Sequence, residues 1–264
     1  MYKILDCHCH IFPDLIAHKA ATAIGDFYDT KMKMDGTADT LLEEGEKAGF
    51  SHFLVHSVAT TPKQVSSINR FISDKVKKSG GRMTGFGAMH PESSDMEQDI
   101  KELISLGLKG VKLHPDIQGY KTDDYRMLKI YEYCEKYSLP VLIHCGDSRY
   151  DYSNPNRIAP ILDIYDKLTV IGAHLGGYTV WEEAAHKLSK YRNFYVDTSS
   201  SLFALDKKTA EQIINIYDED KVLFGTDYPM WNPKEELGRF LSLDLSEEKR
   251  RKILWDNGAK LLNL

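Results

Sequence analysis

The stretch Asp6-Cys7-His8-Cys9-His10 directly follows Tyr2-Lys3-Ile4-Leu5, a run that is typical of a buried strand. Successive side chains of a strand point to opposite faces. We therefore expect Asp6, His8 and His10 to share one face, and Cys7 and Cys9 to share the other. Two imidazoles that converge from the end of a rigid strand are half of a metal site, so this stretch predicts a metal centre.

Short apolar, β-branched runs alternate with segments of helical periodicity along the whole chain. The expected strands are Lys3–Cys7, His52–His56, Met83–Met89, Lys109–Leu113, Pro140–His144, Thr169–Ala173, Phe194–Asp197 and Lys221–Gly225. The expected helices are Thr37–Ala48, Lys63–Lys78, Asp95–Leu106, Asp123–Tyr137, Pro155–Tyr165, Trp181–Lys190, Lys207–Tyr217 and Pro233–Leu241. Strands that alternate with helices pair in parallel through crossover connections.

Eight such units in 264 residues predict an α/β fold, a closed (β/α)8 TIM barrel, as a single domain over residues 1–264. An open doubly wound sheet is the main rival, but the first strand ends in Asp-Cys-His-Cys-His and not in the Gly-rich turn of dinucleotide-binding folds. Residues 11–35 are long for a first loop. On a barrel they would lie over the mouth, as a lid or a substrate-contacting insert.

Histidines concentrate at the ends of the expected strands. The seven at such ends are His8, His10, His56, His90, His114, His144 and His174, and Asp227 follows the last strand. The C-terminal ends of parallel barrel strands ring one mouth, where the active sites of such barrels lie. A lone histidine is usually structural, but seven on one rim predict a functional site.

Composition narrows the class of protein. The net charge is −5, from 34 basic and 39 acidic residues, and no basic cluster suggests nucleic acid or a membrane surface as a partner. The start of the chain lacks the layout of a signal peptide, and no apolar run is long enough to span a membrane. Four cysteines do not make a disulfide framework, which favours a cytoplasmic protein.

Six short motifs resemble the metal-dependent amidohydrolase superfamily, in its amidohydrolase-related branch that includes aminocarboxymuconate semialdehyde decarboxylase. They are Leu5-Asp6-Cys7-His8-Cys9-His10, Gly110-Val111-Lys112-Leu113-His114-Pro115, Leu142-Ile143-His144-Cys145-Gly146, Gly172-Ala173-His174-Leu175-Gly176-Gly177, Phe224-Gly225-Thr226-Asp227-Tyr228-Pro229 and Asn257-Gly258-Ala259-Lys260-Leu261-Leu262. Each motif is weak alone, but the set spans nearly the whole chain in the family's order.

The resemblance implies roles for six of these residues. The metal ligands would be His8, His10, His144 and Asp227, and Asp227 would also carry the proton. His174 would lie beside the metal as a second catalytic residue, and His114 would contact the substrate. From its position after His144, we expect Arg149 to bind a substrate carboxylate.

Imidazole and carboxylate ligands suit one divalent ion, with Zn²⁺ as the first expectation and Mn²⁺ as the alternative. Lys112 leaves a second possibility open. Other branches of the superfamily carboxylate a lysine on the fourth strand to bridge two metals, and Lys112 occupies that strand. The simpler interpretation is a lysine whose charge serves the substrate or a neighbouring carboxylate.

The resemblance covers two reactions on a small-molecule substrate. One is hydrolysis, in which metal-bound hydroxide attacks an amide, lactone or ester carbonyl. The other is a lyase reaction, the non-oxidative decarboxylation of an aromatic or unsaturated acid. The chain is shorter than the decarboxylases of that branch, which favours hydrolysis. A metal-binding barrel without catalysis is a third alternative, and a homodimer is expected from the resemblance alone.

Overall fold

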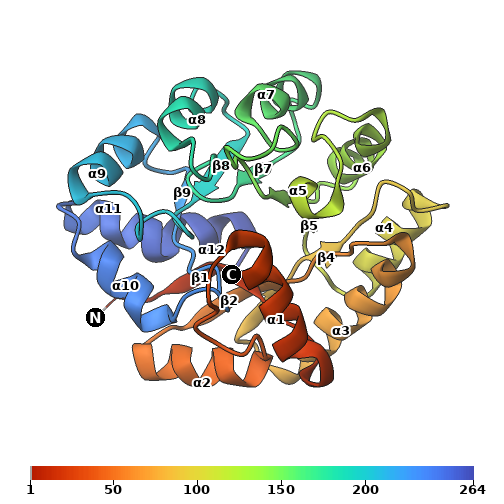
Figure 1. The fold of residues 1–264 in the computed structure, drawn as a ribbon, viewed down its shortest axis with the longest axis horizontal. Coiled ribbons are helices and arrows are strands. Elements are labelled where there is room, and N and C mark those ends of the chain that lie inside the picture. The colour runs from red at the N-terminus through yellow and green to blue at the C-terminus, as the bar shows by residue number, and fades with distance from the viewer. Residues whose placement is uncertain (1) are drawn as a thin grey trace.

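The computed structural model describes residues 2–264 and shows parallel strands surrounded by helices (Figure 1). The strands are β1 (Leu5–His10), β2 (His52–His56), β3 (Met83–Gly85), β4 (Gly87–Ala88), β5 (Val111–Leu113), β6 (Val141–Ile143), β7 (Val170–Gly172), β8 (Phe194–Asp197) and β9 (Val222–Leu223). Only Phe86 separates β3 from β4. Its N–H donates to the Val55 carbonyl at 2.9 Å, so β3 and β4 form one strand of the barrel that changes partner along its length.

The strands pair in parallel and in chain order, and backbone hydrogen bonds close the ring between its last and first strands. The Cys7 N–H donates to the Phe224 carbonyl at 2.8 Å, and the His10 N–H donates to the Tyr228 carbonyl at 2.7 Å. Counting β3 and β4 as one, the barrel has the eight strands that the sequence predicts. The (β/α)8 prediction is confirmed.

The barrel helices are α2 (Ala38–Ala48), α3 (Val65–Lys78), α4 (Met96–Ser105), α6 (Tyr125–Lys136), α7 (Pro155–Ile164), α8 (Trp181–Leu188), α9 (Lys207–Ile216) and α10 (Pro233–Leu241). Their starts follow capping chemistry: Thr37, Asp95 and Asp206 each accept a backbone N–H of the first turn. Within residues 2–264, none of the helices has the length and apolar character needed to cross a bilayer.

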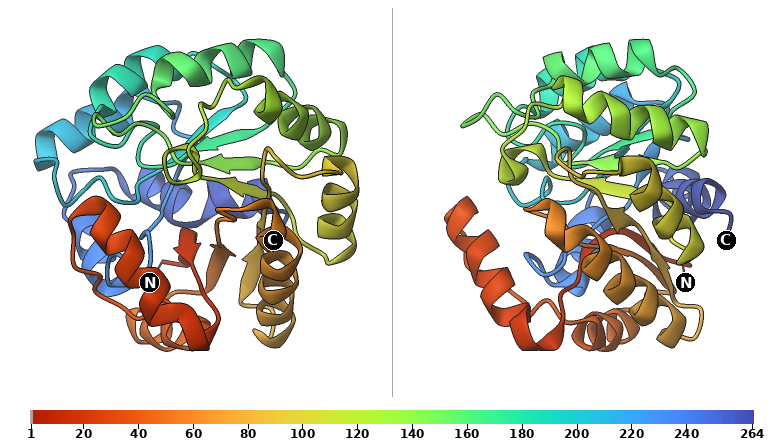
Figure 2. Two further views of the ribbon diagram at one scale, coloured as in Figure 1. Left: turned by 45° about the vertical axis from the view of Figure 1, so that its right-hand side comes forward. Right: turned by 90° about the vertical axis from the view of Figure 1, so that its right-hand side faces the viewer.

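Helix α1 (Asp14–Tyr28) occupies most of the segment that we expected to be a loop. It stands at one end of the barrel, and the C-terminal α12 (Asn257–Leu262) lies at the opposite end (Figure 2). The run from Ile16 to Ile24 holds four alanines, the best helix formers, which explains the helix. The expected position over the mouth agrees with the structure, whereas a helix in this segment was not among the expected elements.

Short elements complete the connections: η1 (Pro62–Gln64), α5 (Pro115–Gln118), α11 (Glu247–Arg251) and the π-helical turn η2 (Lys252–Asp256). Elements η2 and α12 close the end of the barrel opposite α1. A Cβ placed on Gly258 would lie 2.6 Å from Leu5 Cδ2 and 2.9 Å from Cys7 Sγ, so only glycine allows α12 to approach this closely.

A bulge in β1 between Asp6 and Cys9 corrects the predicted alternation of this strand. Cys7 packs with Leu5 in the apolar cluster inside the barrel, and not on the helix side. Cys9 does pack toward the helices, as expected. Asp6 turns away from the two histidines and accepts the Thr226 N–H at 2.9 Å. The extra residue in the bulge allows Cys7 and His8 both to face inward. All four cysteines are buried and free.

Candidate metal centre and active site

Three atoms of the kinds that bind metal ions converge at the C-terminal end of β1. His8 Nε2 lies 3.3 Å from His10 Nε2, and Asp227 Oδ1 lies 3.4 Å from the first nitrogen and 3.5 Å from the second. We call these three residues the metal trio. All three are at least nine-tenths buried, so the trio forms a small polar group within the barrel mouth.

Asp227 reaches the trio from the turn after β9. Its backbone has a φ of 60°, in the left-handed region, and its N–H donates to the His8 carbonyl at 2.9 Å. The Ser200 hydroxyl donates to Asp227 Oδ2 at 2.5 Å, which leaves Oδ1 turned toward the histidines. Aspartate is one of the few residues that tolerate this backbone conformation, so position and chemistry agree.

Asp197, at the end of β8, fixes the orientation of His8. Its carboxylate is fully buried, and Oδ2 lies 2.9 Å from His8 Nδ1. A carboxylate can only accept, so Nδ1 carries the hydrogen and Nε2 presents its lone pair to the trio. The same strand-end rule that selected the histidines would have found Asp197, which the sequence analysis did not single out.

The trio fits a divalent metal ion. Ligand atoms that share one zinc ion lie about 2.1 Å from it, which puts two such atoms about 3.4 Å apart in a tetrahedral arrangement. The three distances within the trio match this separation. Burial lowers the pKa of both His8 and His10 well below the usual range, so both imidazoles are neutral, as metal ligands must be.

His56, at the end of β2, supports the same conclusion. It is fully buried, its ring meets that of His10 edge-on at 4.4 Å, and neither of its ring nitrogens has a hydrogen-bond partner within residues 2–264. Nitrogen atoms of His8, His10 and His56 lie within 4.8 Å of one another. A buried polar group without a partner is costly, and a cation beside it would supply one.

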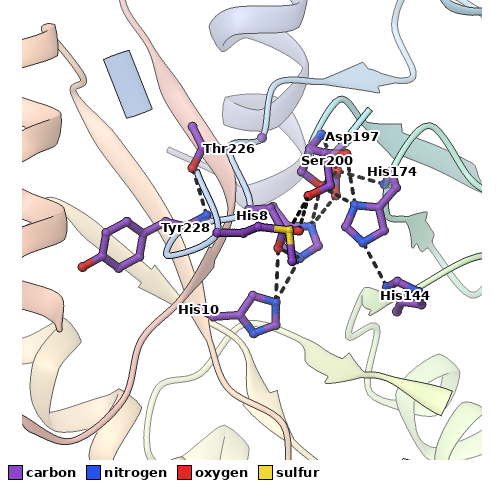
Figure 3. Close-up of polar contacts among 12 residues, drawn as sticks. His8, His10, His144, His174, Asp197, Ser200, Thr226 and Tyr228 are labelled. Carbon is purple, nitrogen blue, oxygen red and sulfur yellow. Dashed lines mark hydrogen bonds and ion pairs between the residues drawn. The ribbon is translucent and has the colours of Figure 1, made fainter. Parts of the chain in front are cut away.

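His174 lies between His8 and His144 (Figure 3). Its ring stacks on that of His8 at 5.2 Å, and its Nδ1 lies 3.0 Å from the Ser199 carbonyl. Since a carbonyl only accepts, His174 Nδ1 carries a hydrogen. Its Nε2 then accepts from His144 Nδ1 at 2.9 Å. Both nitrogens of His174 are therefore engaged.

His144 lies beside the trio and does not join it by a hydrogen bond or ion pair within residues 2–264. Its ring stacks on that of His114 at 4.0 Å, and Asp116 Oδ2 lies 3.7 Å from its Nε2. The hydrogen on Nδ1 leaves a lone pair on Nε2, which keeps His144 chemically suited to bind a metal. Its role as the third imidazole ligand stays a prediction.

Tyr28, from the end of α1, is a site residue that the sequence analysis missed. His114 Nδ1 accepts the Ile117 N–H at 3.3 Å, so Nε2 of neutral His114 carries the hydrogen and donates to Tyr28 Oη at 2.9 Å. The phenolic hydrogen is then free to point to His144 or to a ligand. Burial raises the pKa of Tyr28 well above its usual value, so the hydroxyl stays protonated.

Lys112, on β5, places Nζ 3.1 Å from His8 Nε2, and burial lowers its pKa to about 8. The lysine thus reaches the atom that the trio uses, and the alternative of a carboxylated, bridging lysine stays open. His90 lies apart from the cluster and packs its ring against Tyr120.

Arg149 does not line the cavity at the mouth. Its Nε and Nη2 bind the Asp147 carboxylate at 2.9 and 2.6 Å, and its Nη1 donates to the Phe27 carbonyl at 2.7 Å. These contacts attach the C-terminal end of α1 to the loop after β6. The position of Arg149 therefore favours a structural contact with α1 over the expected contact with substrate.

A cavity of about 460 Å³ opens above the trio, within the usual size range of small-molecule sites. Its polar end consists of His10, His114, His144, His174 and Asp227. The remaining wall is largely apolar, and α1 forms one side of it. The cavity thus brings five of the predicted site residues to one surface.

Comparison with known proteins decides the family. The model of the amidohydrolase family matches residues 5–264. The chain belongs to the amidohydrolase family. The resemblance seen in the motifs is thereby confirmed, and the chain is an enzyme of the amidohydrolase superfamily.

Two curated relatives match this amidohydrolase over about three quarters of its length. One is the 2-amino-3-carboxymuconate-6-semialdehyde decarboxylase of Dictyostelium discoideum, 25% identical over 75% of this chain and 66% of the relative. The chain thus spans slightly under two thirds of that relative. The other is the gamma-resorcylate decarboxylase of a Polaromonas species, 23% identical over 74% of this chain and 75% of the relative.

A solved structure gives the same fold. Dihydroxybenzoic acid decarboxylase from a Polaromonas species, with bound manganese and the inhibitor 2-nitroresorcinol, superimposes with a TM-score of 0.75. The match covers 100% of this chain and 98% of the other at 18% identity.

Proposed function

We propose that this protein is a metal-dependent decarboxylase, which removes CO2 from a small aromatic or unsaturated carboxylic acid without an oxidant. The observation that carries the proposal is the cavity, whose polar end includes His10 and Asp227 of the metal trio and whose other walls are largely apolar. Two curated relatives that are named decarboxylases support the same reaction. This replaces hydrolysis, the first expectation from the sequence, as the leading candidate.

The chemistry needs three contributions from the chain. The substrate carboxylate must be positioned, the carbon–carbon bond must break with its electron pair left on the ring or chain carbon, and that carbon must receive a proton as CO2 leaves. A divalent ion held by His8, His10 and Asp227 would supply positive charge that orients the acid. Apolar walls favour the step because they solvate a carboxylate poorly and neutral CO2 well.

Asp227 is the proposed proton carrier. It lines the cavity, and Ser200 holds one of its oxygens while the other faces His8 and His10. His174 lines the cavity too, but both of its nitrogens are engaged, with Ser199 and His144. We therefore assign His174 a positioning role, through His144.

The first experiment measures metal in the purified wild type and in a His174→Ala variant by elemental analysis. About one equivalent of Mn²⁺ or Zn²⁺ in both proteins is expected, because the trio lacks His174. Two equivalents would place a second ion at Lys112 and would overturn the single-metal proposal. No metal in the wild type after reconstitution would remove the metal centre altogether.

The second experiment tests the reaction. The metal-loaded protein is incubated in D2O with gamma-resorcylate and a panel of substituted benzoates and unsaturated acids, and with an aryl lactone as the hydrolytic probe. Release of CO2 with deuterium at the former carboxyl-bearing carbon is expected for an acid of the panel. Lactone hydrolysis without CO2 release from any acid would overturn decarboxylation in favour of hydrolysis.

A further inference from the structure

The apolar part of the cavity has a composition that restricts what can bind there. One face of α1 supplies Ile16, Ala20, Ala23, Ile24 and Phe27. These positions follow the spacing of a single helical stripe, so the whole stripe points into the cavity. The α1 wall is therefore a continuous apolar surface.

Other residues of the lining continue this surface. They include Ile68 and Phe71 from α3, and Met32 and Met230 from loops. The neutral polar residues Ser57, Thr60 and Ser67 also line the cavity. Such neutral groups can accept or donate a hydrogen bond, but they cannot balance a charge.

No lysine or arginine lines this cavity within residues 2–264. Arg149, the nearest candidate from the sequence, is held by Asp147 and by the Phe27 carbonyl. Lys112 does not line the cavity either, and its Nζ lies 3.1 Å from His8 Nε2. A charge on the far part of a ligand would thus be buried against apolar side chains without a partner, which is strongly unfavourable.

We propose that the cavity takes carboxylic acids with one anionic group and a bulky apolar body, and that it discriminates against a second carboxylate. The single carboxylate binds at the metal trio, and the body packs against the α1 stripe. The inference rests on the proposed function for the place of the carboxylate, and it adds the class of acid that the site accepts.

Binding of non-reacting probes tests this without turnover. Isothermal titration of the Mn²⁺-loaded protein compares benzoate, 4-butylbenzoate and terephthalate. The butyl chain should tighten binding at least about tenfold relative to benzoate, since burying each methylene adds to the affinity. The second carboxylate of terephthalate should weaken binding at least about tenfold relative to benzoate.

A matched pair of variants tests whether the α1 stripe causes the discrimination against a second carboxylate. Ile24→Arg places a cation in the α1 stripe and should remove or reverse the preference against terephthalate. Thr22→Arg adds the same charge on the same helix, at an exposed position outside the cavity lining, and should leave the preference unchanged. An equal shift in both variants would show a long-range charge effect and would overturn the assignment to the α1 stripe.

The outcomes separate this proposal from the proposed reaction. Terephthalate binding as tightly as benzoate in the wild type overturns the proposed ligand class, even if CO2 release is observed. Failure of 4-butylbenzoate to bind overturns it as well. The predicted binding order in a protein that releases no CO2 supports the ligand class while the proposed decarboxylation fails.

Discussion

The metal trio and helix α1 face each other across one cavity, and they are held in opposite ways. Each trio residue is at least nine-tenths buried, and partners such as Asp197 and Ser200 fix their rotamers. In α1 only Ala17, Ala21 and Gly25 are buried, and Leu15 is fully exposed. The difference indicates a rigid centre for chemistry and a loosely packed wall for substrate selection.

The largest effect is expected from Asp227→Asn. Asparagine tolerates the left-handed backbone at this position, but it has no negative charge and cannot carry a proton. Turnover should fall at least about a thousandfold, while the thermal unfolding midpoint changes little. Kinetics and calorimetry on the same preparation measure both. Near-normal turnover in this variant would contradict the role of Asp227 as the proton carrier.

Asp197→Asn should weaken metal binding by about 10- to 100-fold, the usual effect of losing a carboxylate that orients a histidine ligand. The asparagine amide can present a donor to His8 Nδ1 and so favour the wrong tautomer. Competition with a chelator of known affinity measures the change. Asp163→Asn, near the C-terminal end of α7, is the matched control and should bind metal like the wild type.

The rigid centre is also the part that the sequence could predict. Strand periodicity and the rule that functional residues follow barrel strands place His10, His144, His174 and Asp227 at one mouth. That rule specifies positions but not the contacts among them. Whether His144 bonds to His174 or faces the trio depends on side-chain rotamers and tautomers, which one sequence does not contain.

The bulge in β1 shows a second limit. Simple alternation places Cys7 and Cys9 on one face, and the structure separates them because one inserted residue shifts the register. Helix α1 shows a third. Its alanines favour a helix, but the residue that holds its end, Arg149, lies more than 120 positions further along the chain. Tertiary contacts of this kind determine where such a helix lies.

Arg149→Ala tests how loosely α1 is held. The variant loses the hydrogen bond to the Phe27 carbonyl, worth about 1 kcal/mol because the guanidinium is partly exposed. Opening of α1 should become about fivefold more frequent, and tryptic cleavage after Lys19 and Lys31 should accelerate to the same extent. Mass spectrometry of timed digests identifies the cleavage sites.

The control for this prediction is Arg126→Ala. Its ion pairs with Glu92 and Asp124 involve neither α1 nor the loop after β6, so cleavage after Lys19 and Lys31 should not change. Equal acceleration in both variants would mean that general destabilisation, and not release of α1, exposes these sites.

The smallest effect on the metal is expected from Cys7→Ser and Cys9→Ser. Both thiols lie outside the trio, and burial raises the pKa of each well above its usual value, so neither offers a thiolate. Each variant should keep the metal content of the wild type. Stability should fall in both, by about 1–3 kcal/mol, because a hydroxyl replaces a buried sulfur in an apolar cluster. Loss of metal with Cys7→Ser alone would mean that the bulge brings this inward-facing sulfur to the ion. The rigid centre would then extend one residue further down β1.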